Sequence, residues 1–421
     1  MNEPFFGCIG RHLKHSYSKE IHALLAPYGY ELYEVEPDNL GSFISSPSLG
    51  GVNVTIPYKR EIMKYLDVIS PDAAAVGAVN TVVRRDGRLY GFNTDVYGMK
   101  RLIRENGIDL CGKKTLILGT GGTSLTALAA ADSLGAAEKV RVSRFKKDGA
   151  VTYDEMLRFH SDAEIIINTT PVGMFPCSTG AVPAEPSLFN NTEGVIDVIY
   201  NPLRTALVVK AQAMGIPACG GLSMLVFQAV KAAEIFTGLR FSEERGEELY
   251  KKIYASKCNI VLSGMPSSGK TTTGKTLAKK LGRDFYDTDE LIEKEENLSV
   301  SEIFAKYGEE YFRDAETRII KNLGEKTGIV IATGGGSVLR EENVISLKAN
   351  GRIFFLDREP NSLLPSNTRP LAPTPDAIKA LYEKRISTYL STADARIIPD
   401  KEPCVTAEAI IKEMNRAGEQ I

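Results

Sequence analysis

The stretch NIVLSGMPSSGKTTTGKTLAKKLG, residues 259–282, decides the fold of the C-terminal part of the chain. Its apolar start, 259–263, predicts a buried strand, and the residues after it predict a helix. Between them, GMPSSGKT (264–271) fits the pattern G-x-x-x-x-G-K-[ST] at every fixed position. Glycines let backbone N–H groups turn around a phosphate, and the helix N-terminus adds its positive end. We therefore expect a P-loop α/β domain with a parallel sheet that binds a nucleoside triphosphate.

Within the P-loop, Lys270 is expected to reach the β- and γ-phosphates, and the hydroxyl of Thr271 to hold Mg²⁺. The candidate ATP-binding residues are Gly264, Ser268, Gly269, Lys270, Thr271 and Thr272. Asp287 and Asp289 follow at the end of the next predicted strand. Phosphoryl transfer needs one carboxylate near the metal and one to orient or deprotonate the accepting hydroxyl. An acidic first helical turn would explain Asp289 about as well.

Four further motifs follow in order: YFRDAE (311–316), ATGGGSV (332–338), TRPLA (368–372) and LYEKRISTY (381–389). With the P-loop and DTD (287–289), they resemble shikimate kinase over nearly all of 257–400. The resemblance implies that Lys270 and Asp289 are catalytic and that Thr271 and Asp287 lie on the Mg²⁺ side. It also implies that Arg369 closes over the phosphates from a lid. The residues that it places around shikimate are Asp289, Arg313, Gly335, Gly336 and Arg385. A forked guanidinium suits the carboxylate of such a substrate.

A second nucleotide motif lies in LILGTGGTSLTALAAADSLG (116–135), which predicts a strand, a glycine turn and a helix. Gly119 and Gly121 fit the dinucleotide fingerprint, while Ser124 takes its third glycine slot. The next strand ends in SRFKK (143–147) and lacks the acid that would bind the ribose 2′-hydroxyl of NAD. The missing acid and three cations imply NADP, whereas a merely solvated loop would explain only the lysines. The candidate cofactor-binding residues are Gly119, Gly121, Gly122, Ser143, Arg144, Lys147 and Gly221.

Motifs on both sides of this fold resemble shikimate dehydrogenase over about residues 5–245. They are NVTIPYK (53–59), GAVNTV (77–82), GFNTDVYG (91–98), NTTPVGMFP (168–176), DVIYNPLRTAL (197–207) and GGLSMLVFQA (220–229). The resemblance implies a catalytic pair, Lys59 and Asp95. It also implies that Thr55, Asn80, Tyr200 and Gln228 contact the substrate. Reduction of a ketone builds negative charge on the carbonyl oxygen, which a positioned ammonium can stabilise.

HLKHSYSKEIH (12–22) holds three of the four histidines in the chain. A metal site is one interpretation, but H-x₂-H-x₆-H is not a recurring zinc spacing. The stretch instead resembles the H-S-x-S segment of the dehydrogenase family. This implies that Ser16 and Ser18 donate to the substrate carboxylate, reinforced by the helix that starts there. The family usually has proline where this chain has His12 and Lys19, and asparagine where it has Ser143. The last difference could weaken contact with the adenine ribose.

These motifs predict an α/β chain of three domains. They are a substrate-binding domain over 1–100, completed by helices at about 233–250, a Rossmann domain for NADP over 101–232, and a P-loop domain over 257–421. Runs such as KTLILG (114–119) and GVIDVIY (194–200) alternate with helical stretches and predict parallel strands. A charged helical segment, 242–258, places a seam near residue 255.

The overall composition argues against several classes of function. A net charge of −2 gives no global electrostatic basis for binding nucleic acid or an anionic membrane. No run approaches the ~18 apolar residues of a membrane span, and the N-terminus lacks the basic region of a secretory signal. Six scattered cysteines without CxxC are typical of reduced thiols, so we expect a cytoplasmic protein. The oligomeric state is left open, with a homodimer as one option.

Together the two halves predict a bifunctional enzyme of the shikimate pathway that uses NADP(H), ATP and Mg²⁺. The first half would make shikimate from 3-dehydroshikimate, and the second would phosphorylate it. One alternative is a fusion whose dehydrogenase prefers quinate. Another is a catalytically decayed shikimate sensor, against which the presence of Lys59, Asp95, Lys270, Thr271 and Asp289 argues.

Overall fold

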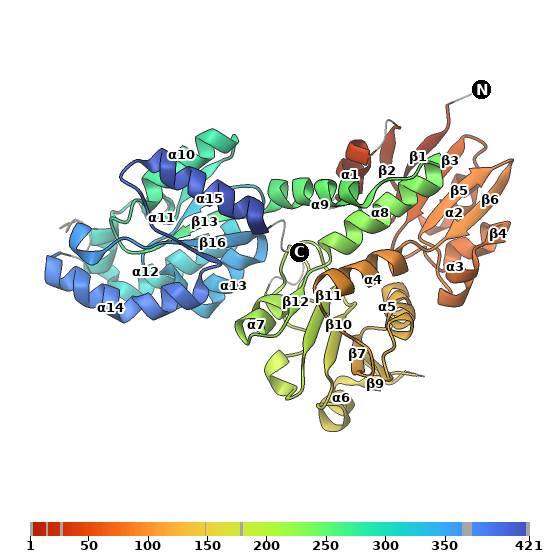
Figure 1. Cartoon of the computed structure of the whole chain (residues 1–421), viewed down its shortest axis with the longest axis horizontal. Coiled ribbons are helices and arrows are strands. Elements are labelled where there is room, and N and C mark those ends of the chain that lie inside the picture. Colours follow the sequence, from red (N-terminus) through yellow and green to blue (C-terminus); the bar gives the residue numbers. More distant parts are fainter. Residues whose placement is uncertain are drawn as a thin grey trace. The chain divides into compact units, whose positions relative to one another are not determined.

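The computed structural model of the chain describes residues 3–13, 16–25, 28–147, 149–176, 180–363 and 373–417. It divides into two compact units (Figure 1). Unit 1 comprises Met1–Met174, Ala181–Asn201 and Lys210–Ile253, and unit 2 comprises Phe175–Gly180, Pro202–Val209 and Tyr254–Ile421. Among the described helices, none combines the length and the apolar character that crossing a bilayer requires.

The first sheet of unit 1 has six strands in the order β2-β1-β3-β5-β6-β4. Strand β1 pairs in parallel with β2 and β3, whereas β3–β5 and β5–β6 are antiparallel. The β5–β6 hairpin turns at Asp86 and Gly87, which both have positive φ, as a two-residue Asp-Gly turn requires. Its strands and helices are β1 (Phe5–Gly10), α1 (Ser18–Leu25), β2 (Tyr30–Glu34), α2 (Leu40–Ile44), β3 (Leu49–Val54), β4 (Val68–Ile69), α3 (Pro71–Val76), β5 (Thr81–Arg85) and β6 (Arg88–Phe92).

The second sheet of unit 1 is parallel throughout, in the order β12-β11-β10-β7-β8-β9. This is the doubly wound order of a Rossmann fold, in which ligands bind at the carboxyl ends of the two central strands, here β7 and β10. Its elements are β7 (Lys114–Leu118), α5 (Gly122–Ser133), β8 (Glu138–Ser143), β9 (Val151–Thr152), α6 (Tyr153–Phe159), β10 (Ile165–Asn168), β11 (Gly194–Asp197) and β12 (Ala218–Cys219). Helix α7 (Ala206–Ala213) is divided between the two units after Val209.

Two long helices connect the sheets of unit 1: α4 (Asp95–Glu105) and α8 (Leu222–Thr237). They pack side by side, because Gly98 lets α4 approach so closely that a Cβ there would lie 2.5 Å from the carbonyl oxygen of Met224. Helix α8 reaches back to the first sheet, where the ring of Phe236 lies 5.6 Å from that of Phe6. Helix α9 (Glu243–Lys257) follows it.

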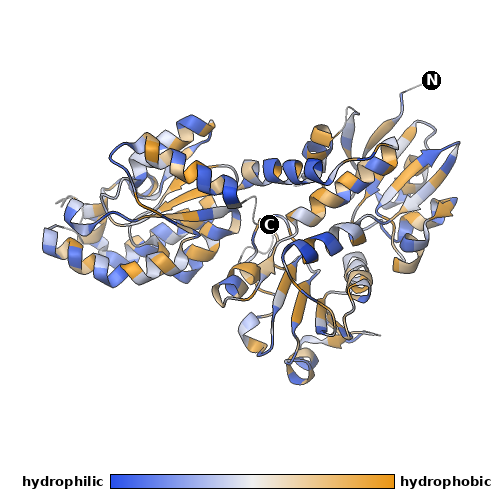
Figure 2. Ribbon diagram, in the orientation of Figure 1, coloured by the Kyte–Doolittle hydropathy of each residue, from blue (hydrophilic) through white to orange (hydrophobic). Residues whose placement is uncertain are grey.

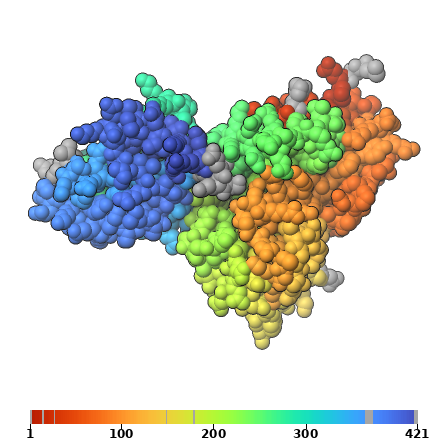
Figure 3. All heavy atoms as spheres, in the orientation of Figure 1, coloured from red at the N-terminus to blue at the C-terminus, as the bar shows by residue number. Residues whose placement is uncertain are grey.

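Unit 2 is a five-stranded parallel sheet in the order β14-β15-β13-β16-β17. Alternate residues of its central strands face opposite sides: Val261 and Ile353 join one buried cluster, and Ile260 and Phe354 the other. Figure 2 shows this apolar interior, and the atoms of α14 and α15 form much of the visible face of unit 2 in Figure 3. Its elements are β13 (Asn259–Ser263), α10 (Lys270–Leu281), β14 (Phe285–Asp287), α11 (Thr288–Glu296), α12 (Val300–Gly324), β15 (Val330–Ala332), α13 (Glu341–Asn350), β16 (Gly351–Leu356), α14 (Pro375–Thr392), β17 (Ala395–Ile397) and α15 (Pro403–Ala417).

The predicted α/β class is confirmed, with two differences in detail. The first sheet is mixed rather than parallel, because β3, β5 and β6 are joined by antiparallel pairs. The strand predicted over 194–200 ends at Asp197, whose buried carboxylate accepts from the side chain of Asn168 and from the backbone N–H of Ile199. These bonds end the ladder, and Tyr200 therefore lies in a loop.

Candidate active sites

Lys59 and Asp95 form a close ion pair in unit 1, with 2.6 Å between Nζ and Oδ2. Asp95 is the first residue of α4, where the helix dipole favours a carboxylate. Asn93 holds this helix start, because its Oδ1 accepts from the backbone N–H groups of Asp95 and Val96. The side chains of Lys59 and Asp95 are only 14% and 8% exposed. The side-chain nitrogen of Lys59 is thus held at a fixed position with little exposure to solvent.

A cluster of buried amides and hydroxyls surrounds Asn80, a predicted substrate residue. Asn80 Nδ2 donates to the hydroxyl of Thr94 (2.9 Å) and to Oε1 of Gln228 (3.5 Å). The cluster continues behind Asn80: Thr81 donates to its Oδ1 (3.0 Å), and Asn53 Nδ2 donates to Thr81 (3.2 Å). The structure therefore brings Asn80 and Gln228 together and fixes the side-chain amide of Asn80.

Ser16 and Ser18 lie together at the start of α1. The hydroxyl of Ser16 donates to that of Ser18 at 3.1 Å and accepts from its backbone N–H. Tyr17 lies between the two serines in the sequence, and its ring centroid is 5.2 Å from that of Tyr200. Burial raises the pKa of the Tyr200 hydroxyl well above its usual value. Thr55 is half-buried at the end of the strand β3 ladder, bonded through its N–H to Ile9.

Of the histidines in the opening segment, His22 is fully buried and His12 is exposed, while His15 lies outside the described residues. The ring of His22 stacks on that of Tyr30, with centroids 3.9 Å apart, and its Nδ1 shares a hydrogen bond with the hydroxyl of Tyr28. Burial lowers the pKa of His22 to about 3, so the ring is neutral. His22 thus belongs to a buried cluster of aromatic rings.

The glycine turn after β7 faces the Lys59–Asp95 pair. A Cβ on Gly122 would lie 3.9 Å from the Lys59 side chain, whereas one on Gly121 would meet nothing within 4 Å. Ser124, in the third slot of the fingerprint, is buried and donates from its hydroxyl to the carbonyl of Gly121 at 2.7 Å. The turn therefore keeps its shape without the third glycine and leaves open space at Gly121.

The basic loop predicted to bind the cofactor lies at the end of β8. Ser143 is half-buried, and Arg144 and Lys147 are exposed. Gly221, at the start of α8, lies against the loop after β11, since a Cβ there would be 2.1 Å from the carbonyl oxygen of Val198. Gly221 therefore holds the backbone of this segment close to the Rossmann sheet.

In unit 2, the predicted phosphate loop and the predicted shikimate residues line one cavity of about 500 Å³. Lys270 donates to the carbonyls of Gly264 and Met265, both at 2.9 Å. The hydroxyl of Thr271 donates to Oδ2 of Asp287 at 2.7 Å, which places two oxygen ligands side by side. The predicted residues in the lining are Ser268, Gly269, Lys270, Thr271, Thr272, Asp287, Asp289, Arg313, Gly335, Gly336 and Arg385.

Asp289 lies deep in this cavity, and its Oδ1 has no hydrogen-bond partner within the described part of the chain. Burial, followed by the negative charges of Glu316 and Asp287, raises the pKa of Asp289 to about 7. A carboxyl with this pKa can accept a proton near neutral pH, as a general base must.

Two arginines face the same cavity. Arg313 donates from Nη1 to the buried carboxylate of Glu316 at 2.8 Å and lies against Gly336, where any Cβ would come within 2.5 Å of the guanidinium. Arg385 is 4% exposed and donates to the carbonyl of Gly335 at 3.0 Å. Its Nε is buried and has no partner among the described residues. Arg369 lies outside the described residues.

Sequence reasoning missed three residues that hold these sites. Thr94 and Asn53 lie inside quoted motifs and hold Asn80 in place, but short polar residues carry no signal for this role. Glu316 closes the FRxxE motif, where it is fully buried and also accepts from Ser337 at 2.5 Å. Its spacing of i, i+3 from Arg313 on one helix face was the available signal.

Comparison with known proteins assigns both units. Residues 8–82 match the family model "Shikimate dehydrogenase substrate binding domain". Over 261 residues the chain is 38% identical to the shikimate dehydrogenase (NADP(+)) of Clostridium beijerinckii, covering 58% of this chain and 96% of that protein. The chain belongs to the shikimate dehydrogenase family. Residues 266–415 match the family model "Shikimate kinase", so the dehydrogenase is fused to a shikimate kinase domain.

Solved structures give the same assignment for the dehydrogenase part. A shikimate 5-dehydrogenase of Thermus thermophilus, solved in complex with NADP(H) and shikimate, aligns with a TM-score of 0.54 and 29% identity, covering 59% of this chain and 99% of that one. A chorismate mutase/shikimate 5-dehydrogenase fusion from Clostridium acetobutylicum aligns with a TM-score of 0.57 and 32% identity, covering 60% and 98%. Fusion of this dehydrogenase to another enzyme therefore occurs elsewhere. The two resemblances seen in the sequence are confirmed.

Proposed function

We propose that unit 1 reduces 3-dehydroshikimate to shikimate reversibly with NADPH, and that unit 2 transfers a phosphoryl group from ATP to the 3-hydroxyl of shikimate. The observation that carries the first activity is the Lys59–Asp95 pair beside the glycine turn. The second rests on the single cavity that joins the P-loop to Asp289 and two arginines.

In the dehydrogenase, Lys59 is proposed to hold the substrate carbonyl and to give its proton to the oxygen as negative charge develops there. Asp95 orients the Lys59 side chain through the 2.6 Å ion pair. Asn80, Gln228 and Thr55 would bind the ring hydroxyls, and Ser16, Ser18 and Tyr200 the carboxylate. NADPH, when bound, supplies the hydride.

The residues of unit 1 fit NADP. The open space at Gly121 and the start of α5 suit a pyrophosphate, because backbone N–H groups and the helix dipole both point there. Arg144 and Lys147 offer exposed positive charge where the ribose 2′-phosphate would lie. Strand β8 ends without an acid, so no carboxylate at its C-terminal end repels that phosphate.

In the kinase, Lys270 and the P-loop backbone would hold the phosphates, and Arg313 and Arg385 the substrate carboxylate. Asp289 would accept the proton of the 3-hydroxyl, which its raised pKa permits near neutrality. Thr271 and Asp287 present hard oxygen ligands 2.7 Å apart, which fit Mg²⁺. The ion would neutralise phosphate charge when bound.

The test is to assay the two activities separately in the full chain and in two single variants. Lys59→Met should lower NADPH oxidation with 3-dehydroshikimate by about 10²- to 10⁴-fold, the range for loss of acid–base catalysis, and leave phosphorylation of added shikimate unchanged. Lys270→Met should do the reverse, so each variant controls for the folding of the other. Loss of both activities in either variant, or loss of neither, contradicts the assignment.

A cytoplasmic location and a homodimer stay predictions.

A further inference from the structure

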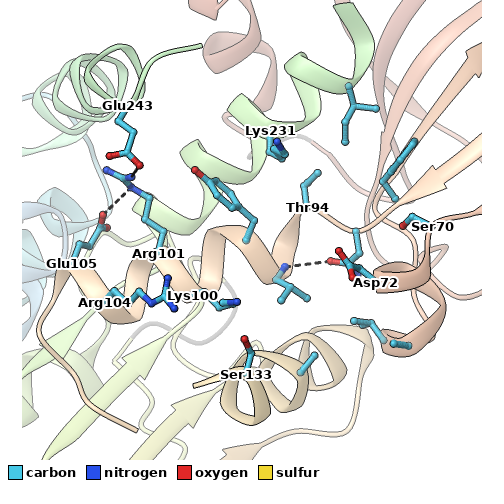
Figure 4. A pocket seen from close by; sticks show the side chains of 18 residues that line it. Ser70, Asp72, Thr94, Lys100, Arg101, Arg104, Glu105, Ser133, Lys231 and Glu243 are labelled. Atoms are coloured by element: carbon cyan, nitrogen blue, oxygen red, sulfur yellow. Dashed lines mark hydrogen bonds and ion pairs between the residues drawn. The ribbon is translucent and has the colours of Figure 1, made fainter. Parts of the chain in front are cut away.

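Unit 1 contains a cavity of about 1000 Å³ along α4, distinct from the cavity of unit 2 (Figure 4). We call it the α4 cavity. Its walls come from α3, the segment Phe92–Thr94, α4, α5, α8 and Glu243 of α9. None of the residues assigned to the dehydrogenase substrate or to NADP lines it. It is therefore separate from the catalytic site, although its volume is that of a small-molecule pocket.

One part of the α4 cavity is apolar. Val96 and Tyr97 of α4 lie in its wall with Phe92, and Val76 of α3 and Ala129 of α5 contribute from the neighbouring helices. Tyr97 is 43% exposed, so part of its ring is open to the cavity. Aromatic and small apolar side chains together make a surface against which a flat ring can stack.

Among the described residues that line the cavity, two cations, Lys100 and Arg104, and one carboxylate, Asp72, form no ion pair, so the unpaired charge in the wall is net positive. Arg101 pairs with Glu105 and Glu243 at 3.3 Å each, and Figure 4 shows these three side chains together. Lys231 pairs with Glu234 at 2.7 Å, but Lys100 and Arg104 form no ion pair with any residue that the structure describes.

Lys100 and Arg104 are four residues apart on α4, so they lie on one face and repel each other. Val96 lies one turn before them on the same face. An anion placed between the two cations would remove their repulsion, and an apolar body attached to it would cover Val96 and Phe92.

We propose that the α4 cavity is a binding site for a small organic carboxylate with a planar apolar body. The carboxylate binds Lys100 and Arg104, and the ring lies in the apolar part of the cavity. Thr94 lines the α4 cavity and also accepts a hydrogen bond from Asn80. Thr94 is therefore the residue that lies between the ligand and the proposed substrate residue Asn80.

The test is isothermal titration of 2-naphthoate into the full chain saturated with NADPH, shikimate and ADP, which together occupy the catalytic sites and cannot react. We expect a dissociation constant of about 1 mM or tighter, which a ligand of this size reaches at ordinary efficiency. The uncharged 2-naphthamide should bind at least about tenfold more weakly, because it loses the charge-assisted bonds.

Three variants locate the binding. Lys100→Gln/Arg104→Gln should weaken 2-naphthoate at least about tenfold, the loss expected for charge-assisted bonds. Ala75→Phe, at an exposed position of α3 in the wall, should weaken binding by placing a ring in the cavity. Arg158→Gln, an exposed arginine on α6, should bind as the wild type does. No binding to the saturated wild type overturns the proposal, as does equal binding to the wild type and the double variant or to the acid and the amide.

Discussion

The substitution Asp289→Asn should stabilise unit 2 above pH 7 while it strongly lowers kinase activity. The pKa of Asp289 is raised from 3.8 to about 7 by burial and by neighbouring carboxylates. A carboxyl group whose pKa is raised on folding destabilises the folded state only at pH values at which the group is ionised. The stability of unit 2 should therefore fall as pH rises from about 4 to about 7 and should stay low above that range.

The size of the effect follows from the shift. About 3 pKa units at about 1.4 kcal/mol each give an upper limit of about 4 kcal/mol. Asparagine has the same shape and no charge, so Asp289→Asn should recover about 2 to 4 kcal/mol at pH 8. For a unit of this size this corresponds to roughly 5–15 °C in melting temperature. At pH 4 the wild-type carboxyl is already protonated, and the difference should vanish.

The assay is differential scanning calorimetry of the full chain at pH 4 and pH 8. The transition of unit 2 is identified as the one that ADP raises. Glu290→Gln is the matched control, because Glu290 is an exposed acid in the first turn of the same helix, with a surface ion pair to Lys275. It should change stability by less than about 1 kcal/mol. Phosphorylation by Asp289→Asn should fall about 10²- to 10⁴-fold at every pH. Equal stability of variant and wild type at pH 8, or an equal gain at both pH values, would refute the reasoning.

Three further predictions concern unit 1. Gly121→Ala should fold normally, since the added Cβ has no neighbour within 4 Å, but it should raise the KM for NADPH at least about tenfold. Gly221→Ala is its counterpart: it should lower the melting temperature, because the added Cβ collides with the backbone carbonyl of Val198. Arg144→Gln/Lys147→Gln should reduce the preference for NADPH over NADH at least about tenfold, measured as the ratio of kcat/KM values. Asn53→Ala should raise the KM for 3-dehydroshikimate more than it lowers kcat, by loosening the cluster around Asn80. A destabilised Gly121→Ala, an unchanged cofactor preference, or an unchanged KM in Asn53→Ala would each contradict the corresponding role.

The sequence predicted the local elements of the two candidate sites better than the residues that hold the candidate side chains in place. The P-loop and the glycine turn are local, so their strands, turns and helices could be predicted from spacing and glycine alone. The ion pair between Lys59 and Asp95 joins residues far apart in the chain, and only the family resemblance placed them together.

Long-range features could not be predicted from local patterns. The antiparallel pairing of β5 and β6 depends on contacts between strands, and β11 ends early because the side chains of Asp197 and Asn168 meet. Glu316 illustrates the same point: its burial and its bonds to Arg313 and Ser337 depend on how α12 packs against the loop after β15. No single-residue preference reports such contacts.

The central claim is that one chain carries out two consecutive steps. The most direct measurement is to incubate the purified full chain with 3-dehydroshikimate, NADPH and Mg·ATP, and to follow NADPH optically and the products by mass spectrometry. We predict loss of NADPH and accumulation of shikimate 3-phosphate, which forms only when ATP is present. If NADPH is not consumed, or if shikimate accumulates without phosphorylation in the presence of Mg·ATP, the account is contradicted.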